Sequence, residues 1–258
     1  MLNLGLIGAN GRMGQEITHL VASQPNNYTL TAAIVSNSTK ATPELTKAAI
    51  IISHDLAHLN NVEVVIDFSS PKTSLEVVAA CLNHKIPLVI GTTGFTQEEY
   101  QIIEAASQQI PVLVSPNMSL SVNVLFKLAS LVATKLPDFE AEIIEAHHRH
   151  KKDAPSGTAI KLGELIAQAR EIEFTSHAKY SRHGISEARH KNDIGFGVIR
   201  GGDIVGMHDV LFIGEGETLH LTSEITNRSS FAHGALLAAS FLADQPPGLY
   251  NMFDALKL

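Results

Sequence analysis

The fold of this chain is decided by its first fourteen residues, which read MLNLGLIGANGRMG from Met1 to Gly14. The apolar run 2–7 predicts a buried strand, and the apolar positions 13, 17, 20 and 21 lie on one face of a following helix. Between them, glycines at positions 8, 11 and 14 predict a tight turn, where backbone N–H groups and the helix N-terminus can receive a pyrophosphate. We therefore expect a dinucleotide-binding domain.

An ordinary strand-to-helix turn is the alternative interpretation of this motif. Its spacing departs from G-x-G-x-x-G because Asn10 stands where the second glycine would be. The place of the motif, directly after the first strand of an alternating domain, favours dinucleotide binding.

Short apolar runs alternate with helical patterns through the first half of the chain. Strands are expected at 2–7, 29–35, 62–68, 87–90 and 111–114, and crossover helices at 75–82 and 96–109. Thr96 and Glu99 form a capping box at the start of the second of these helices. This alternation predicts an α/β fold with a doubly wound, Rossmann-like parallel sheet.

The pattern changes beyond Asn117. A helix is expected at 122–136, a strand at 139–146, a helix at 154–170 with Pro155 in its first turn, and strands at 195–200, 205–213 and 218–226. These elements predict an α+β domain with a mixed sheet, and the apolar helix at 231–242 is expected to return to the first domain. The predicted domains are 1–118 with 228–258, and 119–227.

Composition narrows the class of protein. The chain has 258 residues, 45% of them hydrophobic, and a net charge of −7 with no basic stripe, so we expect no nucleic-acid partner. Its single cysteine, Cys81, cannot form an internal disulfide. No run approaches the roughly 20 apolar residues of a membrane span, and the start has no signal-peptide pattern. We therefore expect a cytoplasmic protein with no membrane partner.

The end of the second strand bears on the choice of dinucleotide. NAD-specific sites usually carry an acidic residue there, but residues 33–40 read AIVSNSTK, without a carboxylate. Arg12 and Lys40 could approach a 2′-phosphate, although Lys40 could equally be a solvated loop lysine. The cofactor is expected to be NADPH or NADH, with NADPH favoured.

Two further loops follow parallel strands at their carboxyl ends. Gly91 to Gly94 reads GTTG and Ser115 to Met118 reads SPNM. Open α/β sheets bind ligands at this edge, so both loops could line the nicotinamide end. Taken alone, each could also be an ordinary turn.

The densest chemistry lies at residues 145–158, which read EAHHRHKKDAPSGT. A strand ends here in a cationic cluster and a helix begins, so histidine could donate a proton, lysine supply charge, and Ser156 to Thr158 offer N–H groups to a carboxylate. A small dianionic substrate suits this cluster. A zinc site of His147, His148 and His150 is one alternative, disfavoured by the neighbouring cations, and a solvated basic loop is another.

Together these motifs closely resemble the dihydrodipicolinate reductase family. The resemblance runs almost end to end, through residues 8–14, 67–69 (DFS), 91–94, 145–151, 153–158, 200–206 (RGGDIVG) and 231–235 (FAHGA). The histidine-rich stretch is its most distinctive part.

The resemblance implies an enzyme of diaminopimelate and lysine biosynthesis. Such enzymes reduce 4-hydroxy-tetrahydrodipicolinate, a small cyclic dicarboxylate, to tetrahydrodipicolinate with hydride from NADH or NADPH. By match to the motif, His147 would be the proton donor and Lys151 the second catalytic cation, while His148, Gly157 and Thr158 would hold the substrate carboxylates. No metal is required.

The resemblance also assigns the cofactor site and the assembly. The expected cofactor contacts are Gly8, Ala9, Asn10, Gly11, Arg12, Met13, Gly91, Thr92, Thr93, Ser115, Pro116, Asn117 and Met118. Residues 119–227 would bind substrate and assemble a homotetramer through the central strands. Family members often carry an acidic residue in the ribose loop where this chain has Val35 and Ser36, so the family's cofactor preference does not carry over directly.

Two other classes of protein remain as alternatives. Another two-domain NAD(P)-dependent dehydrogenase, acting on an aldehyde through a covalent thiol, would need a reactive cysteine, but Cys81 falls inside a predicted crossover helix. A nucleotide-sensing protein without turnover is disfavoured by the intact His147 and Lys151.

Overall fold

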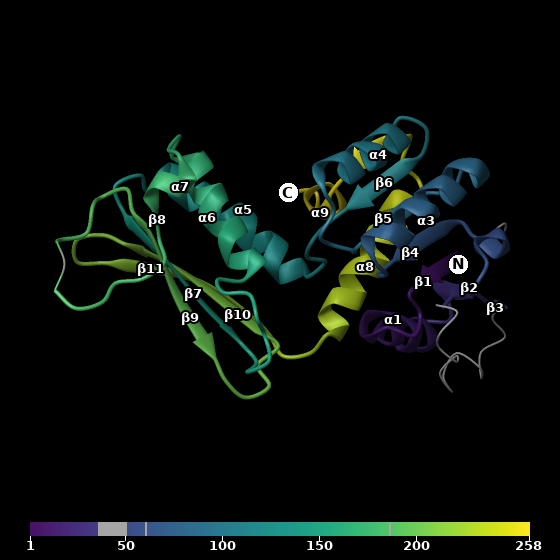
Figure 1. The fold of residues 1–258 in the computed structure, drawn as a ribbon, viewed down its shortest axis with the longest axis horizontal. Coiled ribbons are helices and arrows are strands. Elements are labelled where there is room, and N and C mark those ends of the chain that lie inside the picture. Colours follow the sequence, from purple (N-terminus) through teal and green to yellow (C-terminus); the bar gives the residue numbers. More distant parts are fainter. Residues whose placement is uncertain (36–50, 60, 186) are drawn as a thin grey trace. The chain divides into compact units, whose positions relative to one another are not determined.

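The computed structural model describes residues 1–35, 51–59, 61–185 and 187–258. The chain forms two compact units (Figure 1). Unit 1 comprises Met1–Leu120 and Arg228–Leu258, and unit 2 comprises Ser121–Asn227. Of the helices within these described ranges, none is long and apolar enough to cross a membrane.

Unit 1 is built on a seven-stranded parallel sheet in the order β12-β6-β5-β4-β1-β2-β3. The strands are β1 (Leu2–Ile7), β2 (Tyr28–Ile34), β3 (Ile51–Ser53), β4 (Val64–Asp67), β5 (Leu88–Ile90), β6 (Pro111–Val114) and β12 (Gly248–Tyr250). Because all the strands are parallel, the loops that follow β1, β4, β5 and β6 meet at one edge of the sheet.

Helices cover both faces of this sheet. They are α1 (Arg12–Ser23), α3 (Pro71–His84), α4 (Gln97–Ser107), α8 (Ser229–Leu242) and α9 (Met252–Leu256), with a 3₁₀ turn η1 (Leu56–Leu59). Leu4 and Ile66 point into a core with α1 and α8, whereas Ile7 and Val65 point into a second core with α3 and α4. Strands buried on both faces explain the nearly continuous apolar runs of the sequence.

Unit 2 contains a mixed five-stranded sheet in the order β11-β10-β7-β9-β8. Its strands are β7 (Glu140–His147), β8 (Ala178–Lys179), β9 (Ile194–Arg200), β10 (Gly206–Ile213) and β11 (Thr218–Ile225), and its helices are α5 (Leu120–Lys135), α6 (Gly157–Ala169) and α7 (Phe174–His177). β10 is antiparallel to β7 and β11, while β9 is parallel to β7 and β8. The predicted fold class, a Rossmann-like parallel sheet plus a mixed sheet, is confirmed.

The two faces of this sheet differ. Along β7 the odd-numbered residues are buried and residues 140, 142 and 144 are only half-buried, and β10 alternates in the same way. Helix α6 packs against β7 and β9. We call the side that carries Glu145, His147 and His208 the covered face, and the side that carries Glu142 and Asp209 the open face.

Local sequence signals explain where helices begin, with one correction. The capping box of Thr96 and Glu99 is present, as predicted. The helix predicted from residue 154 instead begins at Gly157, so Pro155 is not in its first turn. Pro155 follows a cis peptide bond, and Ser156 caps the helix by accepting a hydrogen bond from the N–H of Ala159.

Candidate active site

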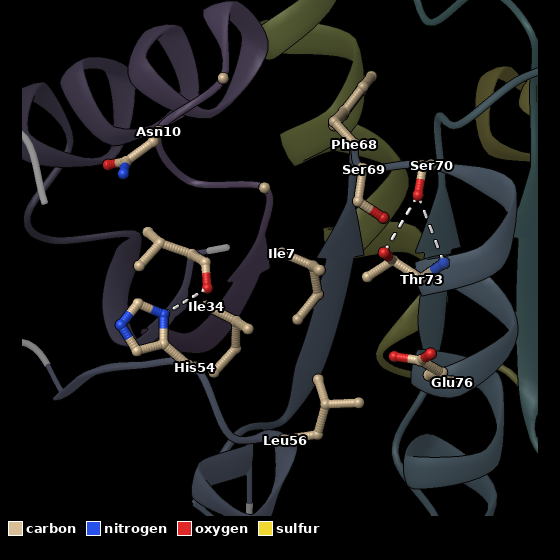
Figure 2. Close-up of a pocket in the computed structure, with 13 residues that line it drawn as sticks. Ile7, Asn10, Ile34, His54, Leu56, Phe68, Ser69, Ser70, Thr73 and Glu76 are labelled. Carbon is tan, nitrogen blue, oxygen red and sulfur yellow. Dashed lines mark hydrogen bonds between the residues drawn. The ribbon is translucent and has the colours of Figure 1, made fainter. Parts of the chain in front are cut away.

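A cavity of about 560 Å³ opens at the loop edge of the unit 1 sheet, beside the ends of β1 and β4 (Figure 2). Its lining residues are Ile7, Gly8, Asn10, Gly11, Ile34, Val35, His54, Leu56, Phe68, Ser69, Ser70, Thr73 and Glu76. Connections leave the sheet in opposite directions from β1 and β4, and open α/β sheets bind their ligands at this crevice.

The glycine-rich turn fits a dinucleotide. Gly8 has a φ of +75°, and a Cβ there would lie 2.4 Å from the carbonyl oxygen of Phe68. A Cβ on Gly14 would lie 2.4 Å from the carbonyl oxygen of Gly8, so only glycine permits this close packing. Helix α1 receives no side-chain cap at Gly11 and has no acidic residue in its first turn. This helix N-terminus therefore suits a pyrophosphate.

The residues predicted to contact the cofactor divide into groups. Gly8, Asn10 and Gly11 line the cavity, and Arg12 is exposed at the start of α1, followed by the half-buried Met13. Ala9 and Met118 have side chains buried in the core, so a cofactor could reach only their backbone.

The other two predicted loops do not line this cavity. A Cβ on Gly91 would lie 2.2 Å from the Phe68 ring, and Thr92, which Thr93 follows, is buried. The loop from Ser115 through Pro116 to Asn117 is closed by the Ser115 hydroxyl, which donates to the carbonyl oxygen of Asn117 at 2.8 Å. Ser36 and Lys40, on which the cofactor prediction partly rests, lie outside the described residues.

Asp67 joins the loop that follows β4 to the loop that follows β5, a role that was not predicted from the sequence. Its buried carboxylate accepts hydrogen bonds from the hydroxyls of Ser69, Ser74 and Thr92. Burial raises the pKa of Asp67, while these hydrogen bonds oppose the change. The signal was available, because an aspartate ends an otherwise apolar buried strand.

Cys81 is not a catalytic nucleophile. It is fully buried in α3, where burial and the negative charge of Asp67 raise the pKa of its thiol. A dehydrogenase that works through a covalent thiol would need an accessible thiolate, so this alternative is disfavoured.

In unit 2, the end of β7 brings Glu145 and His147 together on the covered face. Residues two apart on a strand point to the same side, and Nδ1 of His147 lies 2.6 Å from Oε2 of Glu145. Glu145 is fully buried and His147 nearly so. Glu145 stands in the predicted motif, but no role was predicted for it, although its spacing of two residues from His147 was a usable signal.

Two further donors hold the Glu145 carboxylate. Arg200, at the end of β9, donates from its two Nη atoms to the two carboxylate oxygens, each at 2.7 Å. The backbone N–H of Ser156 donates to Oε1 at 3.0 Å. This bidentate geometry is the strongest way in which arginine binds a carboxylate.

These contacts set the charges of the pair. Burial alone would raise the pKa of Glu145, but hydrogen bonds from Arg200, His147 and Ser156 outweigh it and the pKa is lowered. Burial lowers the pKa of His147, with the charges of Lys151 and Arg200 adding to this effect and Glu145 opposing it. Glu145 is therefore an anion, and His147 gives up a proton more readily than an exposed histidine.

A second buried histidine, His208, lies beside His147 with ring centroids 5.2 Å apart. Its Nε2 lies 3.0 Å from the hydroxyl of Ser156. Burial, followed by the charge of His147, lowers the pKa of His208 to about 4, so it is neutral near pH 7. His208 was not predicted as a site residue, because a single histidine inside an apolar strand gives no signal of its own.

The remaining predicted site residues lie in the segment that follows β7. Lys151 has its Nζ 2.9 Å from a carboxylate oxygen of Asp153, and its charge acts on His147. His148 accepts a hydrogen bond at Nδ1 from the backbone N–H of His150. Gly157 and Thr158 form the start of α6, and nothing lies within 4 Å of the place where a Gly157 Cβ would be. An anion can therefore approach this helix N-terminus.

The zinc alternative finds no support in these contacts. Nδ1 of His147 is engaged by Glu145, and Nδ1 of His148 by a backbone N–H. Across the described part of the chain, no group of three or more His, Cys, Asp or Glu side chains could hold a metal ion.

A Rossmann-like sheet with a glycine-rich turn, and a buried histidine with nearby cations, define the class of nicotinamide-dependent oxidoreductases. Comparison with known families makes this specific. Residues 2–118 match the family model described as dihydrodipicolinate reductase, N-terminus, and residues 121–256 match the model of its C-terminus. The chain belongs to the dihydrodipicolinate reductase family.

Individual relatives agree with this assignment. The 4-hydroxy-tetrahydrodipicolinate reductases of Hahella chejuensis and Nitrosomonas eutropha are 41% and 44% identical, covering all of this chain and 100% and 99% of theirs. The dipicolinate-bound dihydrodipicolinate reductase of Paenisporosarcina sp. TG-14 is 27% identical, with a TM-score of 0.80 over 98% of each chain. A probable dehydrogenase from Thermotoga maritima, 12% identical at a TM-score of 0.67 over 98% of this chain and 92% of its own, shares the fold. Family and fold together imply a nicotinamide cofactor, NAD or NADP.

Proposed function

We propose that this protein catalyses the NAD(P)H-dependent reduction of 4-hydroxy-tetrahydrodipicolinate to tetrahydrodipicolinate, a step of diaminopimelate and lysine biosynthesis. The observation that carries this proposal is the buried Glu145–His147 pair beside Lys151, in a chain whose full-length relatives bear this enzyme's name. Unit 1 would bind the cofactor, and unit 2 the substrate.

His147 is the proton donor in this proposal. When bound, the reduced nicotinamide supplies a hydride, that is, two electrons and one hydrogen. The hydride forms a new carbon–hydrogen bond on the dehydrated substrate ring, and the displaced π electrons build negative charge along the conjugated system. The imidazolium of His147 gives this charge a proton and becomes neutral, while Lys151 stabilises the charge electrostatically. The products are tetrahydrodipicolinate, oxidised cofactor and the water lost on dehydration.

The start of α6 is the proposed site for a substrate carboxylate. The space beside Gly157 is open, so an anion could approach the backbone N–H groups at the start of α6, where Thr158 follows. Lys151 would supply positive charge to the carboxylates, and His148 would bind them as well. A dicarboxylate matches this excess of donors over acceptors, and dipicolinate is bound by the relative from Paenisporosarcina.

For the cofactor we propose that NADPH binds at least as well as NADH. Exposed Arg12 at the start of α1 supports this preference, because a guanidinium binds phosphate well. Glu76 is the single carboxylate among the described residues that line the cavity, and it comes from α3 rather than from the end of β2.

Assembly and location complete the proposal. The open face of the unit 2 sheet presents apolar side chains including the half-buried Ile144 and Leu211 and the 48%-exposed Ile199. Apolar surface of this kind favours association, so we propose a homotetramer formed through this sheet. Light scattering at micromolar concentration tests the assembly, and a monomer would contradict it.

We place the enzyme in the cytoplasm, in line with its free, buried Cys81.

A turnover assay tests the proposed function. The purified protein is mixed with enzymatically made 4-hydroxy-tetrahydrodipicolinate, and the loss of reduced-nicotinamide absorbance is followed with NADPH and with NADH. We expect substrate-dependent oxidation of both cofactors. Cofactor binding without oxidation would favour a nucleotide-sensing protein instead.

A further inference from the structure

The Glu145 carboxylate accepts more hydrogen bonds than the one from His147. Oε2 accepts from Nδ1 of His147 and from Arg200, and Oε1 accepts from Arg200 and from the N–H of Ser156. Each oxygen thus has two donors, and the carboxylate is fully buried. Its position is fixed from three sides by β7, β9 and the start of α6.

We propose that Glu145 is a positioning residue that keeps one proton on Nδ1 of His147 and so makes Nε2 the atom that receives and delivers the catalytic proton. This inference rests on the proposed function, in which His147 is the donor. Glu145 itself does not have to touch the substrate or the cofactor.

The direction of the hydrogen bond carries the first step. Glu145 is ionised and can only accept, so the hydrogen in the 2.6 Å contact belongs to Nδ1 of His147. A neutral imidazole then has its lone pair on Nε2. On that side the chain has Gly206, where a Cβ would lie 3.2 Å from Nε2. The glycine keeps this nitrogen from being crowded by a side chain.

Charge carries the second step. The groups that face His147 are the cations Lys151 and Arg200, neutral His208, and the anion Glu145. Without the anion, an imidazolium would form beside Arg200, which would have lost the carboxylate that it binds, and beside Lys151, whose charge is offset only by Asp153. Glu145 therefore also keeps the charged, proton-donating form of His147 accessible near neutral pH.

A glutamine at position 145 separates these effects from packing. If the amide nitrogen takes the place of Oε1, it meets donors from both Arg200 and Ser156. If it takes the place of Oε2, it meets only one Arg200 donor and can itself donate to Nδ1 of His147. The second orientation costs less, and it moves the histidine proton from Nδ1 to Nε2. Imposing the wrong tautomer in this way disables histidine in hydrolase triads.

The experiment combines nitrogen NMR with kinetics on the full chain labelled with ¹⁵N-histidine, with His147→Gln used to assign the signal. In the parent protein we expect the Nδ1–H tautomer above the pKa of His147, and in Glu145→Gln the Nε2–H tautomer. We expect kcat of Glu145→Gln to fall by at least about 10²-fold. As the pH is raised, the activity of this variant should begin to decline at a lower pH than that of the parent.

Asp209→Asn provides the matched control. Asp209 also accepts from a histidine Nδ1, that of His220, at 3.2 Å, but on the open face, where the His220 side chain is 54% exposed. We expect parent-like kcat and an unchanged His147 signal in this variant, with light scattering showing the same state of assembly as the parent.

Two results would overturn the inference: an Nε2–H tautomer in the parent, which needs no variant to fold, or a Glu145→Gln variant with parent tautomer and kcat within a few-fold. An active His147→Gln would instead contradict the proposed proton donor. The tautomer measurement would still report on Glu145 in that case, so the two failures are distinguishable.

Discussion

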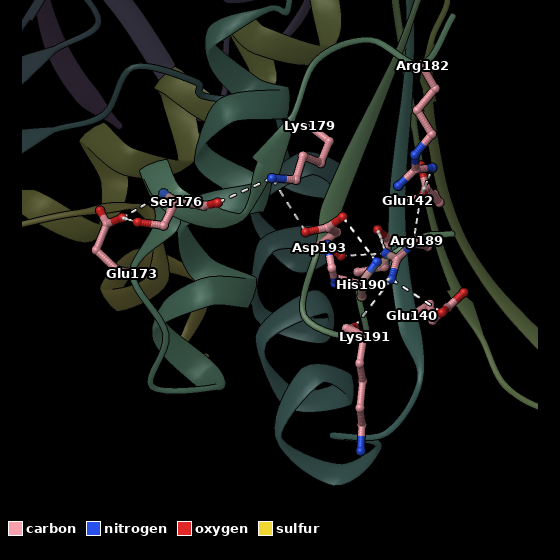
Figure 3. Close-up of polar contacts among 11 residues, drawn as sticks. Glu140, Glu142, Glu173, Ser176, Lys179, Arg182, Arg189, His190, Lys191 and Asp193 are labelled. Atoms are coloured by element: carbon pink, nitrogen blue, oxygen red, sulfur yellow. Dashed lines mark hydrogen bonds and ion pairs between the residues drawn. The ribbon is translucent and has the colours of Figure 1, made fainter. Parts of the chain in front are cut away.

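Two of the arginine-bound glutamates of strand β7, Glu142 and Glu145, lie three residues apart and face opposite sides of the sheet. On the open face, Glu142 lies 2.9 Å from Arg182 and 3.1 Å from Arg189 (Figure 3). On the covered face, Glu145 is bound by Arg200 and also by His147. The same chemistry, a carboxylate with a guanidinium, therefore occurs once with a histidine and once without.

The open-face cluster joins two segments of the chain. Arg189 donates to the carbonyl oxygens of Ala141 and His190 and to that of Asp193, and so joins the segment before β9 to β7 (Figure 3). Its groups pair with one another or with backbone. The covered-face cluster differs because it ends on an imidazole whose second nitrogen is left for chemistry. The comparison teaches that burial and a terminal histidine, rather than ion pairing itself, distinguish the proposed catalytic cluster from the open-face cluster.

Apart from substitution of His147, the largest expected effect on kcat comes from Lys151→Met. We expect kcat to fall by about 10²- to 10⁴-fold, because the developing negative charge loses its nearby cation. KM should also rise if Lys151 binds a substrate carboxylate in the ground state. Lys152→Met, an exposed neighbour in the same segment, is the control. Equal, small effects of both changes on steady-state kinetics would show that the segment is only a basic surface loop.

The next effect is on stability, through His208 of the covered face. Its pKa is lowered by burial from 6.5 to about 4, so the unfolded chain binds its proton more readily than the folded protein. The free energy of unfolding should therefore decrease as the pH is lowered from 6.5 to about 4, by about 3 kcal/mol in all for this group. Denaturant titrations at several pH values should show a shallower decline for His208→Gln than for His220→Gln on the open face. Identical pH slopes would contradict the buried, neutral His208.

Arg12→Ala should have a smaller effect, confined to unit 1. We expect Kd for NADPH to rise about tenfold and Kd for NADH to change little, since only NADPH offers a 2′-phosphate to the guanidinium. Fluorescence titration with each cofactor measures both values. Equal losses, or a strong preference of the parent for NADH, would argue against Arg12 as a phosphate ligand.

The smallest effect is expected for Glu142→Gln. Partly exposed ion pairs contribute little, so the free energy of unfolding should fall by about 1 kcal/mol or less while kcat stays within two-fold of the parent. Chemical denaturation and steady-state kinetics on one preparation measure both. A large loss of kcat here would remove the contrast between the two faces of β7.

The sequence predicted most of the fold because its signals are local. The run Pro111 to Val114 is a strand with the predicted bounds, and the Thr96 capping box starts its helix. The strands Ile51–Ser53 and Gly248–Tyr250 went unpredicted, because three-residue edge strands are too short to show a period. Pro155 was misplaced because proline is accepted in a helical first turn and equally before a cap.

The site was predictable only in part. His147 and Lys151 stand in one dense motif that resembles a known family, so their roles could be predicted. Arg200 and His208 come from other strands, and their contacts depend on pairing in which Arg200 is opposite His147 and His208 is opposite Glu145. Sheet register between distant segments cannot be read from local periodicity.

The central claim is that the covered face of β7 supplies the proton for a nicotinamide-dependent reduction, and His147→Gln tests it most directly. The measurement is kcat with NADPH and 4-hydroxy-tetrahydrodipicolinate, alongside Kd for NADPH, with the exposed His150→Gln as control. We predict that kcat falls about 10²- to 10⁴-fold in His147→Gln, with Kd for NADPH nearly unchanged and His150→Gln close to the parent. A folded His147→Gln protein that binds NADPH and turns over within a few-fold of the parent would contradict the account.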